Sequence, residues 1–243
     1  VVKYVSLRAV LAFAAYNHWE VQQIDVDTAF LYAPVEEELY MQQPEGFEQK
    51  GPNGELLVCL LKKSLYGTKQ ASRNWYNTLK TTLSNYGFCQ SQTDPGVFVY
   101  HNGRHHYILV VYVDDMIIVG PELSWIDNFK DALKTNFNIK DLGQAEWVLG
   151  ISVNVDKDKG IIRLGQTKYI EDMLQRYGLT ECKEVCTPMA IGRVDDNSIY
   201  LDESEIQLYR SIIGSLMYVT VCTRPDIAFP VSNLSKYMNR PQL

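Results

Sequence analysis

The sequence predicts an α+β fold in which a strand-rich region is followed by a helical one. Apolar residues recur at helical spacing near the amino end, and β-branched and aromatic residues dominate two runs in the middle of the chain. From residue 166 onward the pattern is helical. Strands with helices on one side, followed by a helical tail, are typical of an α+β protein with an α-rich appendage.

The first part of the chain alternates helices with short strands. Helical spacing of apolar residues predicts a helix over residues 4–16, and Val21–Val26 follows as a short strand. Residues 42–55 contain several prolines and glycines and are expected to form a turn-rich connection. The next expected elements are a buried strand over Leu56–Leu61 and a helix over Gln70–Tyr86 with Trp75, Leu79 and Leu83 on one face.

Two hairpins are predicted in the middle of the chain. Gly96–Tyr100 and Tyr107–Val113 flank His101-Asn102-Gly103, whose Asn-Gly pair is a strong hairpin signal. Val110–Val119 forms a second hairpin, with Asp114-Asp115 expected at its tip. The remaining expected elements are a helix over 122–136, strands over 146–155 and 160–164, and helices over 166–177, 204–221 and 226–238.

Composition narrows the class of protein. The chain has 243 residues, of which 46% are hydrophobic, enough for a substantial core. Because no run of about 18 apolar residues is present, no membrane span is expected. Five cysteines without a framework spacing indicate free thiols in an intracellular protein, without structural zinc. The chain has no initiator Met and no secretory signal, so we expect it to be a piece of a longer protein.

The overall charge and its local distribution point in opposite directions. A net charge of −6 argues against a nucleic-acid-binding protein, because contacts with phosphate need lysine and arginine. Four basic residues nevertheless lie close together in a segment almost without acids: Lys62, Lys63, Lys69 and Arg73. This local clustering weakens the argument from the net charge.

Three aspartates stand where core residues are expected. Asp114 and Asp115 interrupt apolar strand-forming residues, and Asp25 lies near the end of another apolar strand. Two like charges about 4 Å apart repel by roughly 4 kcal/mol at an effective dielectric near 20, and a divalent cation between them would turn this repulsion into attraction. Such oxygen ligands suit Mg²⁺. The alternatives are an ordinary polar turn at Asp114-Asp115 and a helix N-cap at Asp25.

Three acids on two strands can hold two cations a few ångströms apart. In nucleotidyl transfer one cation activates a 3′-hydroxyl and the other stabilises the leaving pyrophosphate. Spacing alone does not separate this chemistry from that of a metal-dependent nuclease or phosphotransferase.

Several blocks, in order along nearly the whole chain, resemble the reverse transcriptases of copia-type retrotransposons. Tyr112-Val113-Asp114-Asp115 is similar to their YxDD motif, and Gln23–Leu31 resembles their first palm motif. Lys63–Tyr76 is similar to the family's LYGLKQAPRxWY block. Further similar blocks are Phe137–Gly143, Leu149–Ile151, Tyr209–Tyr218 and Thr223–Ile227. The chain departs from the family pattern at Thr68, Ser72 and Pro230, none of which belongs to the three acids.

The resemblance implies a right-hand polymerase fold. Residues 1–165 would form partial fingers and a palm with an antiparallel sheet and packed helices, and residues 166–243 a helical thumb or connection region. The implied function is that of an RNA-directed DNA polymerase within a Pol polyprotein. Its partners would be an RNA or DNA template with its primer, deoxynucleoside triphosphates, and the integrase and RNase H regions of the polyprotein. The implied location is intracellular, in cytoplasmic virus-like particles and the nucleus. The oligomeric state stays open.

Residue by residue, the resemblance assigns Asp25, Asp114 and Asp115 as the catalytic triad that binds two Mg²⁺ ions, with Mn²⁺ as a substitute. Phe30 falls at the steric gate, an aromatic ring that would clash with a ribose 2′-hydroxyl. The alternative is an ordinary core aromatic. Thr28 and Ala29 would offer backbone amides to the triphosphate. The other nucleotide-binding positions implied are Val26, Tyr66, Gly67, Gln70 and Tyr112.

The resemblance also implies contacts with the nucleic acid. It places the primer terminus at a hairpin that contains Leu149, Gly150 and Ile151, for which ordinary strand packing is the alternative. The other implied contacts are Lys69, Arg73, Lys168 and Tyr169; a solvated helix face would equally explain the first two. The family's basic triphosphate grip would lie before Val1, so activity of this chain alone is in question. The competing hypothesis is a catalytically inactive or domesticated fragment that serves as a nucleic-acid-binding or structural module.

Overall fold

The computed structural model describes residues 1–189 and 201–241. It divides into two compact units. The first consists of Val1–Ala145 and Val155–Ile162, and the second of Glu146–Asn154 and Arg163–Leu243. This division differs from the expected boundary after residue 165, because Glu146–Asn154 group with the helices that follow. The assignment of palm and thumb stays a prediction.

A six-stranded antiparallel sheet forms the centre of the first unit. Its strand order is β4-β5-β6-β7-β1-β8. The strands are β1 (Glu20–Val26), β4 (Cys89–Gln90), β5 (Val97–His101), β6 (His106–Tyr112), β7 (Asp115–Gly120) and β8 (Ile139–Gln144). Both predicted hairpins are confirmed. Strand β8 was not predicted, because most of its residues are polar and exposed at the edge of the sheet.

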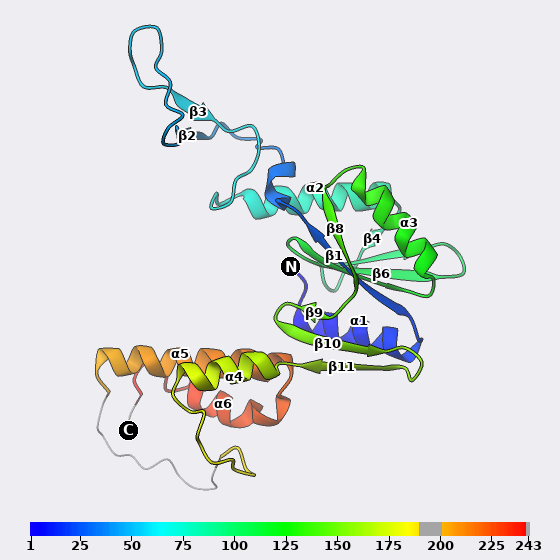
Figure 1. Cartoon of the computed structure of the whole chain (residues 1–243), viewed down its shortest axis with the longest axis vertical. Coiled ribbons are helices and arrows are strands. Elements are labelled where there is room, and N and C mark those ends of the chain that lie inside the picture. Colours follow the sequence, from blue (N-terminus) through cyan, green and yellow to red (C-terminus); the bar gives the residue numbers. More distant parts are fainter. Residues whose placement is uncertain (190–200, 242–243) are drawn as a thin grey trace. The chain divides into compact units, whose positions relative to one another are not determined.

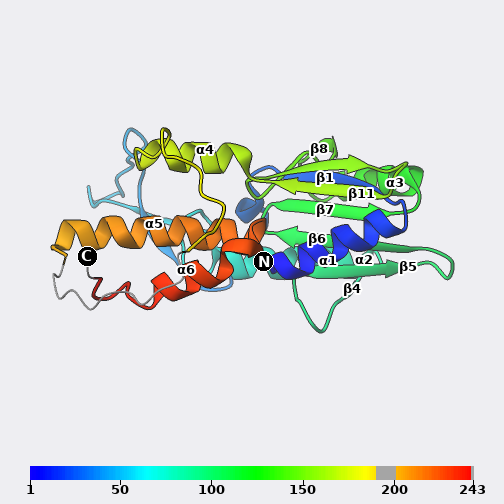
Figure 2. The ribbon, with the colours of Figure 1, turned by 90° about the horizontal axis from the view of Figure 1, so that it is seen from below.

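Helices cover both faces of this sheet (Figures 1 and 2). Helices α2 (Ala71–Asn85) and α3 (Leu123–Lys134) lie on one face, where Trp75 of α2 belongs to the main hydrophobic core. Helix α1 (Tyr4–Tyr16) covers the other face with its apolar side. The expectation of helices on one side only was therefore wrong. Strand β7 is apolar and buried along nearly its whole length, as a strand covered on both faces must be.

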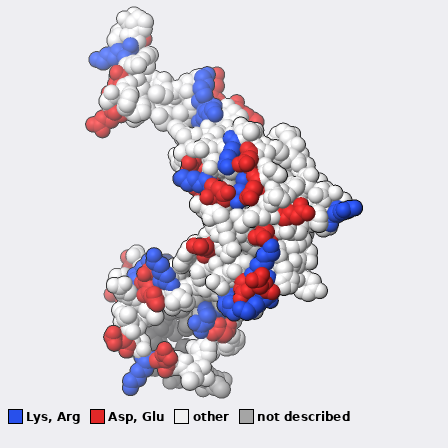
Figure 3. Space-filling model, turned by 45° about the vertical axis from the view of Figure 1, so that its right-hand side comes forward, with Lys and Arg blue, Asp and Glu red and all other residues white. Residues whose placement is uncertain are grey.

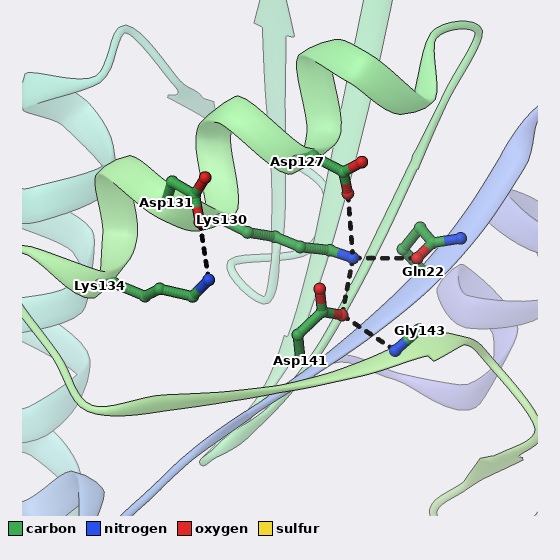
Figure 4. A network of polar contacts seen from close by, with 7 residues as sticks. All are labelled: Gln22, Asp127, Lys130, Asp131, Lys134, Asp141 and Gly143. Atoms are coloured by element: carbon green, nitrogen blue, oxygen red, sulfur yellow. Dashed lines mark hydrogen bonds and ion pairs between the residues drawn. The ribbon is translucent and has the colours of Figure 1, made fainter.

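The pairing of β1 with β8 is reinforced by a buried lysine of α3. Lys130 is 2% exposed and donates to Gln22 Oε1 at 2.9 Å and to Asp141 Oδ1 at 2.7 Å. Asp141 also accepts a hydrogen bond from the Gly143 backbone (Figure 4). The β1–β8 register shifts between Gln23 and Ile24, so these contacts hold the two strands together beside an irregularity.

A short two-stranded sheet, β2 (Tyr40–Gln42) with β3 (Val58–Leu60), lies beyond the 3₁₀ helix η1 (Ala29–Tyr32). The prediction of a buried strand over Leu56–Leu61 was wrong in burial and in length. Leu56 is 73% exposed and Val58 is 58% exposed. A short apolar run does not reveal whether other chain covers it, so composition misled here.

The second unit is mainly helical. Its helical elements are α4 (Thr167–Arg176), α5 (Glu203–Cys222), η2 (Pro225–Ile227) and α6 (Ala228–Ser235). Its strands are β9 (Trp147–Val148), β10 (Ile151–Asp156) and β11 (Ile161–Gly165). The end of β10 and the start of β11 are counted with the first unit. Strands β11, β10 and β9 form a sheet in that order. The strand expected over 146–155 is divided at Leu149-Gly150, where the chain turns between β9 and β10.

Two local features shape the helices of this unit. A capping box opens α5: Asp202 accepts from the Glu205 backbone and Glu205 accepts from the Asp202 backbone. Pro230 lies in the first turn of α6, where a missing N–H costs no helical hydrogen bond, and the helix expected over 226–238 is correspondingly shorter. None of the helices in the described part of the chain is sufficiently long and apolar to cross a membrane.

Candidate active site

Asp25 and Asp115 are direct cross-strand partners, where β1 ends and β7 begins. The neighbours of Asp25 on the strand, Ile24 and Val26, are buried in the main core. Because successive side chains of a strand point to opposite faces, Asp25 lies on the face away from that core. Side chains of directly opposed residues approach closely, so two carboxylates here repel each other.

The turn between β6 and β7 adds the third carboxylate. Tyr112 pairs with Asp115, so the two turn residues are Val113 and Asp114, and the prediction of Asp114-Asp115 at the tip was wrong by one position. Val113 has a φ of 59°, an unfavourable value for a β-branched residue. The Asp114 carbonyl accepts from the Val26 amide at 3.1 Å. Asp25 belongs to β1 and Thr28 occupies the N-cap of η1, so the alternative of Asp25 as an N-cap was also wrong.

The three carboxylates influence one another electrostatically. Burial raises the pKa of Asp25 above its ordinary value and Asp114 raises it further, whereas Lys140 lowers it. Burial likewise raises the pKa of Asp115, with added contributions from Asp114 and Asp25. A raised pKa means that the ionised carboxylate is disfavoured, and a cation beside it would relieve that cost.

A second group of polar residues beside Asp25 was missed. The Lys140 ammonium of β8 lies 4.0 Å from Asp25 Oδ2 and 2.5 Å from Asp27 Oδ1. Asn138 also donates to Asp27, at 2.9 Å. Asp27 follows Asp25 by two residues, in the turn just after β1. This spacing was the available signal, because residues two apart along a strand share one face. Lys140 lies in the Phe137–Gly143 block, for which the resemblance implies no site residue.

Phe30 and Tyr66 form an aromatic pair beside the carboxylates. Their ring centroids are 4.5 Å apart, and Tyr66 is 54% exposed. Burial of the hydroxyl and the charge of Asp114 raise the pKa of Tyr66, while hydrogen bonds from the Phe30 and Ala29 backbones lower it. The Tyr66 hydroxyl therefore lies against the amides that follow Thr28. Phe30 also packs on the edge of the main core, so both interpretations of this ring stay open.

The other predicted nucleotide-binding residues divide into buried and accessible ones. Val26 and Ala29 are 1% and 0% exposed, so only their backbone is available to a ligand. Gln70 donates to Glu37 at 2.9 Å. Together with Tyr66 and Lys69, Gln70 lines a hollow of about 400 Å³. Gly67, which is exposed and has a φ of 89°, lies before α2. Tyr112 is half-buried and lies at the end of β6.

The predicted nucleic-acid contacts are distributed over both units. In the first unit Lys69 and Arg73 are exposed on and before α2. In the second unit Leu149 and Gly150 form the β9–β10 turn, and Ile151 is buried. The remaining two, Lys168 and Tyr169, lie in the first turn of α4. On the face drawn in Figure 3, acidic and basic side chains are interspersed rather than gathered into one basic area.

The three carboxylates suit a metal ion whose remaining ligands come from water and substrate. Within residues 1–189 and 201–241, no three acidic, histidine or cysteine side chains are arranged to enclose a metal on their own. Mg²⁺ commonly takes one or two carboxylates and completes its shell with water and substrate phosphates. Asp25 and Asp115 as direct partners, with Asp114 adjacent, match this requirement.

Comparison with known proteins identifies the class of protein first. A family model described as "Reverse transcriptase (RNA-dependent DNA polymerase)" matches residues 1–191. The chain therefore belongs to the reverse transcriptase family.

The relatives then narrow this class to copia-type retrotransposons. The chain is 40% identical over 248 aligned residues to the retrovirus-related Pol polyprotein from transposon TNT 1-94 of Nicotiana tabacum, covering 99% of this chain and 18% of that protein. The chain is also 38% identical over 245 residues to the retrovirus-related Pol polyprotein from transposon RE1 of Arabidopsis thaliana. That alignment covers 99% of this chain and 16% of the polyprotein. The putative transposon Ty5-1 protein YCL074W of Saccharomyces cerevisiae is 30% identical over 220 residues, with 90% of this chain and 70% of that protein aligned. The chain thus spans less than a fifth of the two Pol polyproteins.

Proposed function

We propose that this chain is the polymerising core of a copia-type reverse transcriptase, an RNA-directed DNA polymerase that adds deoxynucleotides to a primer 3′-hydroxyl. The observation that carries the proposal is the direct pairing of Asp25 with Asp115, with Asp114 next to them in the turn. Membership of the reverse transcriptase family supports it. The partners would be an RNA or DNA template with its primer, and deoxynucleoside triphosphates.

In this proposal the carboxylates hold two Mg²⁺ ions, or Mn²⁺ in their place. When bound, these ions would neutralise the phosphate charge and lower the pKa of the primer hydroxyl. Asp25 and Asp115 would hold the ions from two adjacent strands, and Asp114 from the turn. Lys140 keeps Asp25 and Asp27 partly neutralised before a substrate arrives. Phe30 would exclude a 2′-hydroxyl by packing against the sugar, and Tyr66 would have to leave the Ala29 and Phe30 amides before a triphosphate could reach them.

The right-hand layout belongs to the same proposal. The first unit would supply the palm, with β2 and β3 as part of the fingers, and the helices of the second unit would supply the thumb. The names of the relatives further suggest that the chain acts inside a Pol polyprotein beside other Pol regions.

The test is primer extension on poly(rA) primed with oligo(dT), with dTTP and Mg²⁺, using the 243-residue chain beside a form extended upstream. We expect extension by at least one form, its loss with EDTA, and its loss in Asp115→Asn. The control is Asp158→Asn, which changes an exposed aspartate away from the three acids. Folded protein that binds the duplex yet never extends it would favour the inactive module instead.

A further inference from the structure

Asp25 on β1 has a carboxylate on one side and a lysine on the other. Its antiparallel partners are Asp115 on β7 and Lys140 on β8. Directly opposed side chains of neighbouring strands lie close together on one face of the sheet. The Lys140 ammonium accordingly lies 4.0 Å from Asp25 Oδ2. Two carboxylates and one ammonium thus form a row across the three strands.

A β-bulge decides which residue of β8 faces Asp25. The register of β1 and β8 shifts between Gln23 and Ile24, with Leu142 as the extra residue on β8. An unshifted register would place Asp141 opposite Asp25, and a third carboxylate would join the row. The bulge instead brings a lysine to this position. It also turns Asp141 to the other face, where Asp141 binds the buried lysine of α3 (Figure 4).

The ammonium of Lys140 also contacts Asp27. Lys140 Nζ lies 2.5 Å from Asp27 Oδ1, and Asn138 donates to Oδ2 of the same carboxylate at 2.9 Å. The Asp27 amide in turn donates to the Asn138 carbonyl at 2.9 Å. The hydrogen bond with Asp27 raises the pKa of Lys140, so this side chain is a cation at neutral pH. The lysine therefore makes a short contact with Asp27 and a longer one with Asp25.

Stability alone gives little reason for this arrangement. The side chain of Lys140 is 60% exposed, and exposed ion pairs contribute little to folding. Its charge acts on the acids instead: burial and the charge of Asp114 raise the pKa of Asp25, whereas Lys140 lowers it. Lys140 thus offsets, from within the chain, the same repulsion that a bound cation would offset.

We propose that Lys140 is an internal counter-ion of the carboxylate site, which competes with a divalent cation for Asp25, and that Asp27 holds the ammonium aside when the cation binds. The inference rests on the proposed function, which assigns the metal ions to Asp25, Asp114 and Asp115. Its consequence is a low affinity for the free ion, because the ammonium and the ion repel each other. Occupancy of the site then depends on the substrate phosphates that complete the shell of the metal.

The first test measures Mn²⁺ binding to the metal-free protein, without nucleotide or nucleic acid, from the electron paramagnetic resonance signal of free Mn²⁺. Lys140→Met should bind Mn²⁺ about ten-fold more tightly than the wild type, because the competing charge is gone. Lys140→Arg keeps the charge and should stay near the wild type. An unchanged affinity in Lys140→Met, or equally tight binding by Lys140→Arg, would overturn the proposal.

Lys134→Met is the matched control for this measurement. Lys134 is also an exposed lysine that pairs with an aspartate, Asp131, but it lies on α3. Its replacement changes the net charge of the protein by the same amount and should leave Mn²⁺ affinity unchanged. A gain in affinity equal to that of Lys140→Met would show that only the net charge matters and would overturn the proposal.

A double-mutant cycle tests the part given to Asp27. Asp27→Asn alone should weaken Mn²⁺ binding about five-fold, because the released ammonium moves toward Asp25. If Asp27 acts through the lysine, the same substitution in Lys140→Met should have almost no effect. Equal weakening in both backgrounds would show that Asp27 acts only through its own charge. That result, or no weakening in either background, would overturn the role of Asp27.

These measurements separate the inference from the proposed function. Mn²⁺ binding should be lost in Asp115→Asn, and binding that persists unchanged there would place the ion elsewhere and overturn the inference. If the wild type extends a primer but Lys140→Met binds Mn²⁺ no more tightly, the inference alone fails. If all the binding differences appear and neither the chain nor its upstream-extended form extends a primer, the proposed polymerase activity alone is refuted.

Discussion

The indole nitrogen of Trp75 donates a hydrogen bond to the carbonyl oxygen of Val113 over 2.7 Å. A buried side chain of α2 thereby holds the residue with positive φ that precedes Asp114 and Asp115. The second unit repeats this arrangement, since Tyr218 binds the carbonyl of Leu149, another non-glycine residue with positive φ in a two-residue turn. In both turns the strained conformation is retained by a single aromatic donor from a helix.

The Trp75 bond predicts an effect on the site that ordinary packing would not produce. Trp75→Phe keeps an aromatic ring beside Phe137 but removes the N–H donor. We expect a loss of about 2 kcal/mol in the free energy of unfolding, because a partly buried carbonyl loses its partner. Primer extension should need a higher Mg²⁺ concentration for half-maximal rate. Urea unfolding and a Mg²⁺ titration measure the two effects.

Trp125→Phe is the control for this prediction. Trp125 packs against the same core and stacks on Tyr107, at a centroid distance of 3.8 Å. Its replacement should cost stability through lost packing and leave the Mg²⁺ requirement unchanged. A similar rise in the Mg²⁺ requirement for both variants would show that Trp75 acts only through packing.

The repulsion among the carboxylates predicts a pH dependence of stability in metal-free buffer. Burial, Asp114 and Asp25 raise the pKa of Asp115 above 3.8. The folded chain then binds this proton more tightly than the unfolded chain, so the contribution of Asp115 to stability falls as pH rises through the folded-state pKa. Relative to the wild type, Asp115→Asn should become more stable between about pH 4 and pH 7.

Thermal unfolding in EDTA, run on both proteins across that pH range, measures this difference. Adding Mg²⁺ should stabilise the wild type and leave Asp115→Asn nearly unchanged, since the variant lacks one ligand. A stability difference that stays constant with pH would contradict the assignment of a raised pKa to Asp115.

The contact between Phe30 and Tyr66 predicts a change in sugar selection. Phe30→Ala should accept ribonucleotides, because the ring that would meet a 2′-hydroxyl is removed. The measurement is the ratio of kcat/KM for dTTP to that for UTP, which should fall by at least about ten-fold. Tyr32→Ala, which removes another aromatic ring of η1, is the control and should keep the ratio. An unchanged ratio in Phe30→Ala would make Phe30 an ordinary core residue.

The buried lysine of α3 predicts a difference between two lysines of that helix, each of which pairs with an aspartate. Lys130→Met should lower the free energy of unfolding by about 2 kcal/mol, because Asp141, partly open to solvent, loses its buried partner. Lys134 also pairs with an aspartate, Asp131, but both side chains are exposed, and Lys134→Met should change little. Urea unfolding compares the two, and equal losses would contradict the role given to burial.

The sequence predicted the helices and hairpins of the first unit because they follow clear periodic patterns. The apolar spacing of Trp75, Leu79 and Leu83 correctly predicted a buried helix face. Strand β8 escaped because an edge strand with exposed polar residues has no apolar alternation. The hairpin tip was misplaced by one residue, because pairing register depends on contacts across strands rather than on composition.

The three acids that the structure brings together could be picked out from the sequence, whereas Lys140 and Trp75 beside them could not. Asp25, Asp114 and Asp115 were identifiable because charged residues inside apolar strands are unusual. Lys140 was not, because an exposed lysine on an edge strand looks like any surface residue until β8 is placed beside β1. The hydrogen bond of Trp75 to Val113 joins residues 38 positions apart, and no local pattern encodes it.

The small sheet of β2 and β3 has a consequence for handling the protein. In the described part of the chain, each of these strands pairs only with the other, and apolar residues such as Leu56 and Val58 are open to solvent. Unpaired strand edges with apolar side chains recruit further strands from other molecules. We therefore expect concentrated preparations to self-associate through this hairpin, and Val58→Lys to reduce the association seen in sedimentation velocity. Oligomers that persist unchanged in that variant would have to form through another surface.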